Sequence, residues 1–484
     1  MKKINRKRGA ATNSIILSFV QCLTMVTSIL QTMILSRELT EIEYGTYSQG
    51  LLVVNFIVPF LLLGLANALT YFSGQREIDV HKYIDTIFSI VLFLGLVGAA
   101  GIIILKGSIR DYFGNLALES ILPLVAFLPV LLNMITLYQT LFVAENMATS
   151  IAVRNAVVAV VQITIIAVSV YVFHDIHVIY SLLLVMDFLQ VLIFALVFRN
   201  RRYSIRIKTI DKGIAKNIFK YSIPLALSTA ISTITVYMDK LLIGNMMNVE
   251  DFALYTNMAK ELPFSFIVGS FTTVIMPVLI RMHADGNDTK LKMYWSKYLE
   301  IGICITWILC GAAIFCSEDL LVFLYSEKYA RGISVFIIYL TVELCRYSYF
   351  GMILSTFGKT KIIVISSLLS LLCNFVLNII LFHFFGMIGP AIASLISILL
   401  MEVFQIIQSC KLLKCRIREA FDIKFMALLI TEIIFVGITI RTMGIYLITN
   451  SLVRLIFCGG SIAIILSAIN HKRILKLIKD INNL

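Results

Sequence analysis

Long apolar stretches separated by short polar loops occupy almost the whole of this chain. A helix needs roughly 20 mostly apolar residues to cross a hydrocarbon core of about 30 Å. The pattern therefore predicts an all-α integral membrane protein with about 14 transmembrane helices. The predicted spans are 13–35, 44–73, 84–105, 118–142, 153–173, 178–198, 218–243, 255–280, 294–316, 333–356, 362–384, 389–410, 425–443 and 446–468.

The composition agrees with this interpretation. Hydrophobic residues make up 59% of the chain and charged residues 14%, against about 25% charged residues in a soluble domain. The basic start at residues 1–8 resembles that of a signal peptide, but the apolar run after it is too long and lacks a small-x-small cleavage site. We interpret that run as a retained first span. The nine cysteines form no CxxC pair, so we expect them to pack between helices and to form neither a disulfide nor a zinc framework. We expect no metal site and no cofactor.

The distribution of lysine and arginine tests the predicted topology. If the N-terminus is cytoplasmic, the cytoplasmic segments contain 31 of the 41 Lys and Arg residues, the external loops contain six, and four lie within spans. This asymmetry follows the positive-inside rule. We therefore predict that both termini are cytoplasmic. The net charge of +13 then needs no nucleic-acid partner to explain it.

Two sequence blocks indicate an internal repeat. Residues 36–48 follow the first span and residues 244–256 follow the seventh, and at a constant offset of 208 residues Glu43 aligns with Asp251 and Tyr47 with Tyr255. In each block the acid lies where it can cap the N-terminus of the next helix. The repeating unit is thus six spans, and an even number keeps both copies in the same orientation in the membrane.

The repeat predicts three parts. An N-terminal lobe at 1–206 holds spans 1–6, a C-terminal lobe at 207–424 holds spans 7–12, and an extra helix pair with a cytoplasmic tail occupies 425–484. Two such lobes suit an alternating-access transporter. The sequence offers no nucleotide-binding domain for a directly ATP-driven pump, because Gly358-Lys359-Thr360 lacks the earlier glycine and the preceding strand of a phosphate loop.

Two motifs carry a family resemblance. Ser36-Arg37-Glu38-Leu39-Thr40-Glu41-Ile42-Glu43-Tyr44-Gly45-Thr46-Tyr47-Ser48 resembles the block after the first span of bacterial polysaccharide transporters. Tyr237-Met238-Asp239-Lys240-Leu241-Leu242-Ile243-Gly244 resembles the end of their seventh span. These proteins are the Wzx-like flippases of the MOP superfamily, which also includes lipid II flippases and MATE drug exporters. The resemblance extends over the full length in span count, loop sizes and repeat.

The resemblance implies a V-shaped pair of six-helix lobes in the bacterial plasma membrane. It also implies a function without enzymatic catalysis, which is to move an undecaprenyl-diphosphate-linked oligosaccharide from the cytoplasmic to the outer leaflet for capsule, exopolysaccharide or O-antigen synthesis. The expected partners are this lipid-linked glycan and membrane lipid, with a polysaccharide polymerase and assembly proteins as further candidates. The two extra spans resemble those of the lipid II flippases, where they help to form a groove for the lipid tail.

Charged side chains inside spans cost roughly 2.5–3.5 kcal/mol each on insertion scales, so each one is a candidate functional residue. Those in this chain are Asp187, Asp239, Lys240, Lys260, Glu261, Glu343, Arg346, Glu402, Glu432 and Arg454. Structural explanations compete with a function for several of them. Glu343 and Arg346 are three residues apart and can neutralise each other, whereas Arg454 can pair with Glu432 between the last two spans.

A flippase for a diphosphate lipid needs a wet and cationic cavity. We expect four residues to supply its positive charge: Arg37, Lys240, Lys260 and Arg346. Two acids, Asp239 and Glu343, are expected to hold these cations in the empty state and to carry coupling protons or cations. Several polar residues within spans can line a passage for sugar or simply form hydrogen bonds between helices: Gln21, Gln31, Asn55, Asn67, Gln162, Gln190, Gln405 and Gln408.

Three other functions remain open at this point. A lipid II flippase shares the topology and the lipid carrier. A cation-coupled drug exporter typically has twelve spans and a compact acidic site, whereas this chain has two more spans and buried cations. A membrane polymerase or ligase for glycans usually needs a sizeable external loop, and the external segments around 106–118 and 317–332 are short.

Overall fold

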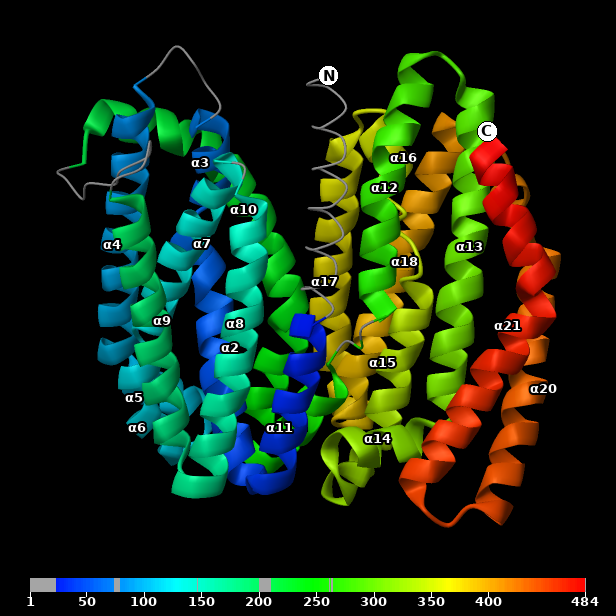
Figure 1. Cartoon of the computed structure of the whole chain (residues 1–484), viewed down its shortest axis with the longest axis horizontal. Coiled ribbons are helices and arrows are strands. Elements are labelled where there is room, and N and C mark those ends of the chain that lie inside the picture. Colours follow the sequence, from blue (N-terminus) through cyan, green and yellow to red (C-terminus); the bar gives the residue numbers. More distant parts are fainter. Residues whose placement is uncertain are drawn as a thin grey trace. The chain divides into compact units, whose positions relative to one another are not determined.

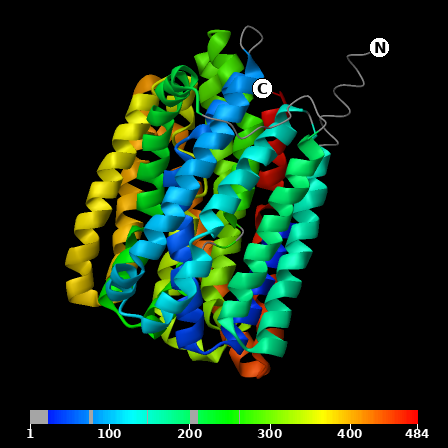
Figure 2. The same cartoon turned by 90° about the vertical axis from the view of Figure 1, so that its left-hand side faces the viewer.

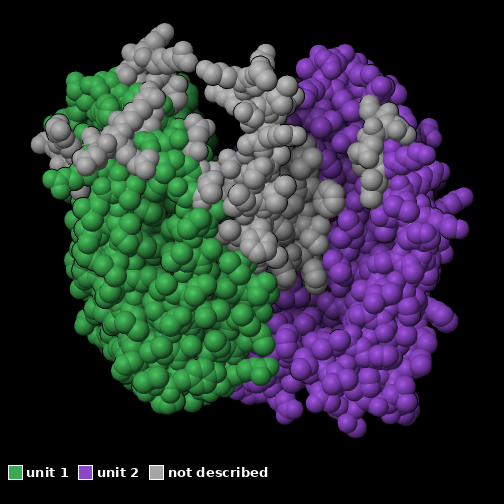
Figure 3. Space-filling model, in the orientation of Figure 1, with its two compact units in different colours: residues 1–253 green, residues 254–484 purple. Residues whose placement is uncertain are grey.

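A computed structural model of the chain describes residues 23–73, 79–145, 147–199, 210–260, 262 and 264–483. These residues form helices and loops, and no β-strand occurs among them (Figure 1). The chain divides into two compact units, residues 1–253 and 254–484, which Figure 3 shows in different colours.

The first unit is a bundle of long helices, and the 90° view in Figure 2 shows several of them running side by side. Its buried apolar core includes Leu69, Phe88, Tyr138 and Phe198. Residues 23–38 are helical. The helices that follow are α2 (Glu41–Leu62), α3 (Leu65–Ser73), α4 (Val80–Ile104), α5 (Lys106–Phe113), α6 (Leu116–Val125), α7 (Leu128–Ala144), α8 (Ala148–Val168), the π-helix η1 (Ser169–Phe173), α9 (Ile176–Phe198), α10 (Lys212–Met246) and the start of α11 (Val249–Met258).

The second unit is built around α13, whose Trp295 and Leu299 are fully buried. The C-terminal helices α20 and α21 both pack on α13 and on each other, so they belong to this unit. Its helices after α11 are α12 (Phe264–Ala284), α13 (Asp288–Phe315), α14 (Ser317–Tyr325), the 3₁₀-helix η2 (Glu327–Gly332), α15 (Ile333–Cys345), α16 (Met352–Thr356), α17 (Thr360–Phe385), α18 (Ile388–Leu412), α19 (Ile417–Ala420), α20 (Ile423–Leu447) and α21 (Ser451–Asn483).

Eleven helical segments of the described residues are long and apolar enough to cross a membrane. The other three predicted spans differ for separate reasons. Residues 13–22 of the first span lie outside the described residues. The spans predicted at 255–280 and 333–356 are each divided into two helices, because regular helix stops at Met258 and at Cys345. The all-α membrane class is thus confirmed, and the count of fourteen stays a prediction.

The repeat is visible in the way two helices begin. At α2, the Thr40 hydroxyl accepts a hydrogen bond from the N–H of Glu43 (3.2 Å), and the Glu43 carboxylate accepts one from the N–H of Thr40 (2.9 Å). At α11, the side chain of Asn248 accepts a hydrogen bond from the N–H of Asp251 (2.7 Å). Thr40 and Asn248 are 208 residues apart, so equivalent positions cap equivalent helices and supply acceptors to exposed N–H groups.

The first motif block also packs against the rest of unit 1. A Cβ added at Gly45 would lie 2.4 Å from the carbonyl oxygen of Val249, so only glycine permits this close approach of α2 to the start of α11. The carbonyl of Tyr47 accepts a hydrogen bond from the buried hydroxyl of Tyr180 (2.6 Å). Much of this block therefore serves the packing of α2 against α11 and α9.

The compact units divide later in the sequence than the predicted lobes do. The helix α10 corresponds to the seventh predicted span, yet it packs against α2, α3, α4 and α5 of unit 1. Near its end, a Cβ added at Gly244 would lie 2.7 Å from the ring of Phe113. The contacts of α10 therefore group it with the first six spans, and the lobe boundary at 206 stays a prediction about the sequence repeat.

Candidate transport site

A polar cavity of about 490 Å³ lies inside the first unit. This volume falls in the range of roughly 300–1,000 Å³ that is typical of sites for small molecules. The cavity is lined by the helix at 23–38 and by α2, α7, α8 and α9, all of them parts of predicted spans. Its lining residues are Thr24, Thr27, Ser28, Gln31, Val58, Leu132, Ile135, Thr136, Gln139, Arg154, Asn155, Val158, Ala159, Gln162 and Asp187.

Hydroxyl and amide groups supply most of the polar lining. The hydroxyls of Thr27 and Thr136 donate to backbone carbonyls of their own helices, at 2.9 and 2.8 Å. A hydroxyl that donates in this way still has lone pairs for a further donor. The amide side chains of Gln31, Gln139 and Gln162 can both donate and accept. The cavity therefore offers uncharged hydrogen-bonding groups at a depth where the surroundings are apolar.

Two charged residues line the cavity, Arg154 and Asp187, and Gln190 links them. The Arg154 guanidinium donates to the side-chain oxygen of Gln190, and the Gln190 amide donates to Asp187 at 2.8 Å. Arg154 also donates to the side chain of Asn155 at 2.9 Å and lies over the ring of Phe194. Asp187 and Gln190 are buried. The charges of Arg154 and Asp187 therefore largely cancel, which lowers the free-energy cost of burying them.

The sequence predicted part of this cavity. Gln31, Gln162 and Asp187 were candidates, and the structure brings all three together, whereas Gln21 lies outside the described residues. Arg154 was counted among the cytoplasmic cations, although it is the second residue of the span predicted at 153–173. The structure instead places it inside α8, which begins at Ala148. The only feature of the sequence that indicated a role for Arg154 was its position at the start of a predicted span, with no acidic residue next to it.

Two predicted site residues of the first unit lie next to each other on α10. The Asp239 carboxylate is buried and accepts a hydrogen bond from the backbone N–H of Lys240 (2.8 Å). The Lys240 ammonium lies 5.7 Å from the centre of the Tyr237 ring, a cation–π contact. Arg37 is exposed and lies in the last turn of the helix at 23–38.

The other predicted site residues belong to the second unit, where both cations lie at interruptions of predicted spans. Lys260 comes two residues after the end of α11, and Arg346 is the C-cap of α15. Carbonyl oxygens at a helix C-terminus carry partial negative charge, which favours a cation there. Non-helical backbone at membrane depth is tolerated where protein or a water-filled cavity surrounds it. Glu261 lies outside the described residues.

Residues of the neighbouring helix α13 contact the backbone at the break after α15. The indole N–H of Trp307 on α13 donates to the carbonyl of Leu344 at 3.0 Å. A Cβ added at Gly302, also on α13, would lie 2.7 Å from the carbonyl oxygen of Tyr347. The buried carboxyl of Glu402 in α18 lies within electrostatic range of Arg346. Glu343 is buried one turn before Arg346, so two acids from different helices lie in the neighbourhood of this cation.

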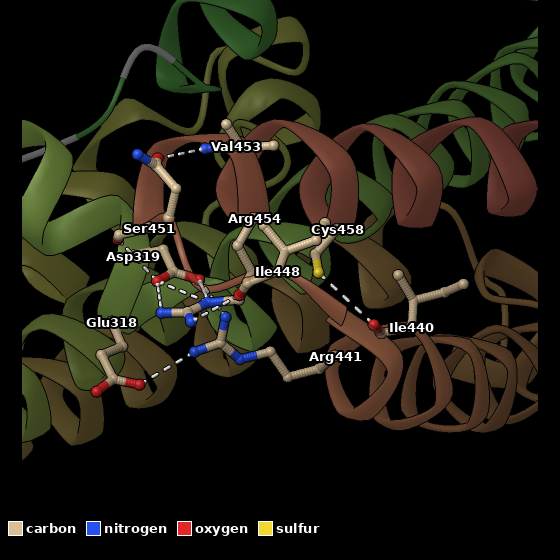
Figure 4. A network of polar contacts seen from close by, with 10 residues as sticks. Glu318, Asp319, Ile440, Arg441, Ile448, Ser451, Val453, Arg454 and Cys458 are labelled. Atoms are coloured by element: carbon tan, nitrogen blue, oxygen red, sulfur yellow. Dashed lines mark hydrogen bonds and ion pairs between the residues drawn. The ribbon is translucent and has the colours of Figure 1, made fainter. Parts of the chain in front are cut away.

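The predicted pairing of Arg454 with Glu432 is wrong. Arg454 binds Asp319 of α14, with its Nε 2.9 Å from a carboxylate oxygen, and Arg441 of α20 binds the same carboxylate (Figure 4). Ser451 donates to it as well, at 2.8 Å. Glu432 instead accepts from Asn470 at 2.8 Å. The acid of a short helix outside the predicted spans thus binds both arginines, because it lies beside the turn between α20 and α21.

The sequence is similar to those of known polysaccharide biosynthesis proteins. Residues 34–334 match the model of a family described as polysaccharide biosynthesis protein. The capsular polysaccharide biosynthesis protein CapF of Staphylococcus aureus is 24% identical over 185 residues, which are 38% of this chain and 47% of CapF. The match thus spans about half the length of this relative.

Solved structures of low sequence identity share the fold. The lipid II flippase MurJ in its inward closed conformation has a TM-score of 0.74 at 14% identity, over 95% of this chain and all of that one. An inward-facing multidrug resistance transporter of the MATE family has a TM-score of 0.62 at 14% identity, over 81% of this chain and 94% of that one. The chain is thus a multi-pass membrane protein with the fold of the MOP superfamily, and it belongs to the polysaccharide biosynthesis protein family.

Proposed function

We propose that this protein is a flippase for an undecaprenyl-diphosphate-linked oligosaccharide. It moves the repeat unit from the cytoplasmic to the outer leaflet of the bacterial plasma membrane by alternating access, and the glycan then enters surface polysaccharide. The observation that carries this proposal is the cavity of hydroxyl and amide groups inside unit 1, in a member of a polysaccharide biosynthesis family.

The chemistry of the cavity suits a glycan. Sugar hydroxyls each donate and accept hydrogen bonds and lose them in hydrocarbon, where an unpaired polar group costs several kcal/mol. Glutamine, threonine and asparagine side chains can replace water as partners without binding any one sugar ring by charge. A drug exporter for lipophilic cations would gain more from an apolar pocket with net negative charge, and here the one lining carboxylate is balanced by Arg154.

The diphosphate needs positive charge on its way. We assign this task to Arg37, Lys240, Lys260 and Arg346, and we assign the holding of these cations in the empty state, with proton or cation coupling, to Asp239 and Glu343. The placement of Lys260 and Arg346 at helix breaks supports the assignment, since discontinuous helices commonly form substrate sites in transporters.

Deleting the gene is expected to abolish the surface polysaccharide and to make its lipid-linked precursor accumulate. Complementation with Gln162→Leu should restore transport roughly tenfold less well than the wild type, since an unmade buried hydrogen bond costs about 1–3 kcal/mol. The matched control is Thr164→Val on the same helix, because Thr164 is exposed and bonds only its own helix. Radiolabelled precursor and surface glycan are measured at equal membrane abundance.

Other outcomes would reassign the function. Normal surface polysaccharide together with sensitivity to cationic drugs would mean a drug exporter. Arrested peptidoglycan synthesis with accumulated lipid II would mean a lipid II flippase. Equal transport by the Gln162→Leu and Thr164→Val variants would show that the cavity is not part of the transport path. The conclusion drawn from the gene deletion would still hold.

The topology gives a separate prediction. In a cysteine-free background, an impermeant thiol reagent added from outside should label Asn248→Cys and should miss Ser204→Cys. The reason is the excess of lysine and arginine in the segments predicted to be cytoplasmic; Ser204 itself lies outside the described residues. Labelling of both cysteines from the same side would contradict the topology.

A further inference from the structure

A second hollow, of about 690 Å³, lies at the end of α18 in the second unit. We call it the basic pocket. It is formed by the last turns of α18, the turn that follows and the short helix α19, on the side of the unit predicted to face the cytoplasm. Its lining residues are Ile407, Cys410, Lys411, Lys414, Cys415, Arg416, Ile417, Arg418 and Glu419.

The walls of the basic pocket are fixed to the rest of unit 2. Glu419 forms an ion pair with Lys292 of α13, and the Ser296 hydroxyl donates to the carbonyl of Ala420 at 2.9 Å. On the other side, the N–H of Cys415 donates to the carbonyl of Cys410 at 3.0 Å and closes the turn. The cations that line the pocket are therefore carried on a backbone that two helices hold in place.

The basic pocket has an excess of positive charge. Within the part of the chain that the structure describes, Lys411, Lys414 and Arg418 form no ion pair. The single lining carboxylate belongs to Glu419, and its hydrogen bond from Lys292 lowers its pKa. It therefore stays ionised and bound to Lys292, so it leaves the other cations uncompensated.

An apolar stripe leads along α18 to this pocket. Leu400, Val403 and Ile407 are 53%, 50% and 36% exposed. Their spacing of three and four residues places them on one face of the helix, and Lys411 continues the same line one turn later. In a membrane-spanning helix an exposed apolar face contacts lipid chains, so this face joins hydrocarbon to a cationic hollow.

We propose that the basic pocket binds the phosphate headgroup of a lipid in the cytoplasmic leaflet, with the lipid chain along Leu400, Val403 and Ile407. The general excess of cations in cytoplasmic loops does not account for this arrangement. Four cations within eight residues line one hollow here, whereas basic pockets between helices on the cytoplasmic side are recognised sites for anionic lipid headgroups. The site is separate from the polar cavity of unit 1.

The test uses the full-length protein purified in detergent and native mass spectrometry. The probes are phosphatidylglycerol, undecaprenyl phosphate and zwitterionic phosphatidylcholine. The triple variant Lys411→Gln, Lys414→Gln, Arg418→Gln should bind the two anionic lipids at least about tenfold more weakly, because each cation near the surface contributes to the attraction. The control removes as many charges from the cytoplasmic end of α21: Lys472→Gln, Lys476→Gln and Lys479→Gln.

Each outcome decides the proposal. If the triple variant loses binding of both anionic lipids and the control variant does not, the pocket is a general phosphate-headgroup site. Loss of only undecaprenyl phosphate identifies the carrier lipid, and loss of only phosphatidylglycerol identifies a bilayer lipid. Equal binding by the triple variant and its control overturns the proposal. The charge-retaining variant Lys411→Arg, Lys414→Arg, Arg418→Lys should bind like the wild type, and single Lys411→Gln gives a smaller loss if the triple variant does not fold.

Discussion

Arg346→Ala is expected to slow oligosaccharide transport by roughly 100- to 1,000-fold, whereas Arg346→Lys keeps most of the activity. The side chain lies at the break after α15, where we assign it to the substrate diphosphate. Two unit charges about 4 Å apart interact by about 4 kcal/mol at an effective dielectric constant of 20. Alanine removes that attraction, while lysine keeps the charge.

Surface polysaccharide is measured for both variants at matched membrane abundance, together with Glu343→Gln. The acid variant should slow the cycle while substrate still binds, because we assign Glu343 to the empty state. If Arg346→Ala transports as well as the wild type, Arg346 is only the structural partner of the acids around it. The cation that binds the diphosphate would then have to be sought among Arg37, Lys240 and Lys260.

Asp319→Ala is expected to lower the free energy of unfolding of the second unit by about 3–5 kcal/mol, the usual cost of removing one partner of a buried ion pair. The Asp319 side chain is 1% exposed and binds both Arg441 and Arg454, so two guanidinium groups lose their shared acceptor. Figure 4 shows how this carboxylate joins α14 to both C-terminal helices.

The control is the neighbouring Glu318→Gln. Glu318 also binds Arg441, at 3.0 Å, but its side chain is 65% exposed, and exposed ion pairs contribute about 0–1 kcal/mol. Thermal unfolding of the purified protein in detergent measures both effects. We call Asp319, Arg441 and Arg454 the Asp319 cluster. Similar losses of unfolding free energy in the two variants would show that burial does not determine how much this cluster stabilises the unit.

The Asp319 cluster also has a predictable response to pH. Burial raises the pKa of Asp319, but hydrogen bonds from Arg454, Arg441 and Ser451 lower it, and the folded-state pKa is below the ordinary value of 3.8. A depressed folded-state pKa means that the stabilisation is complete above pH 3.8 and is lost as the pH falls through the lower value. The difference in stability between wild type and Asp319→Ala should therefore be constant from pH 5 to 8 and shrink only below about pH 4.

The positions of most helices could be predicted from the sequence, since each apolar run must satisfy its backbone within one helix to cross a membrane. Interruptions of predicted spans, such as those after Met258 and after Cys345, were not predicted. Charged residues lie at both breaks, Lys260 and Glu261 at the first and Glu343 and Arg346 at the second, but they were interpreted as charges within continuous spans. The break after Cys345 also depends on contacts with Trp307 and Gly302 of another helix.

The candidate site shows the same division. Gln31, Gln162 and Asp187 were recognisable because polar groups are costly inside apolar runs. Their meeting in one cavity was not recognisable, and neither was the part played by Arg154, because both depend on how α8 and α9 pack beside the helix at 23–38. Arg454 was paired with the wrong acid for a similar reason, since its partner Asp319 is 135 residues away in the sequence.

The sequence by itself determined the membrane class, the helix positions, the capping residues of the repeat and the resemblance to polysaccharide transporters. Each of these depends on the local order of apolar, polar and capping residues, which is given directly by the amino-acid sequence. Only the tertiary structure decided which charges meet, where helices break and which polar groups share a cavity. Those properties arise from contacts between distant segments, and the energy of a buried charge is set by its neighbours in space and not by its neighbours in the chain.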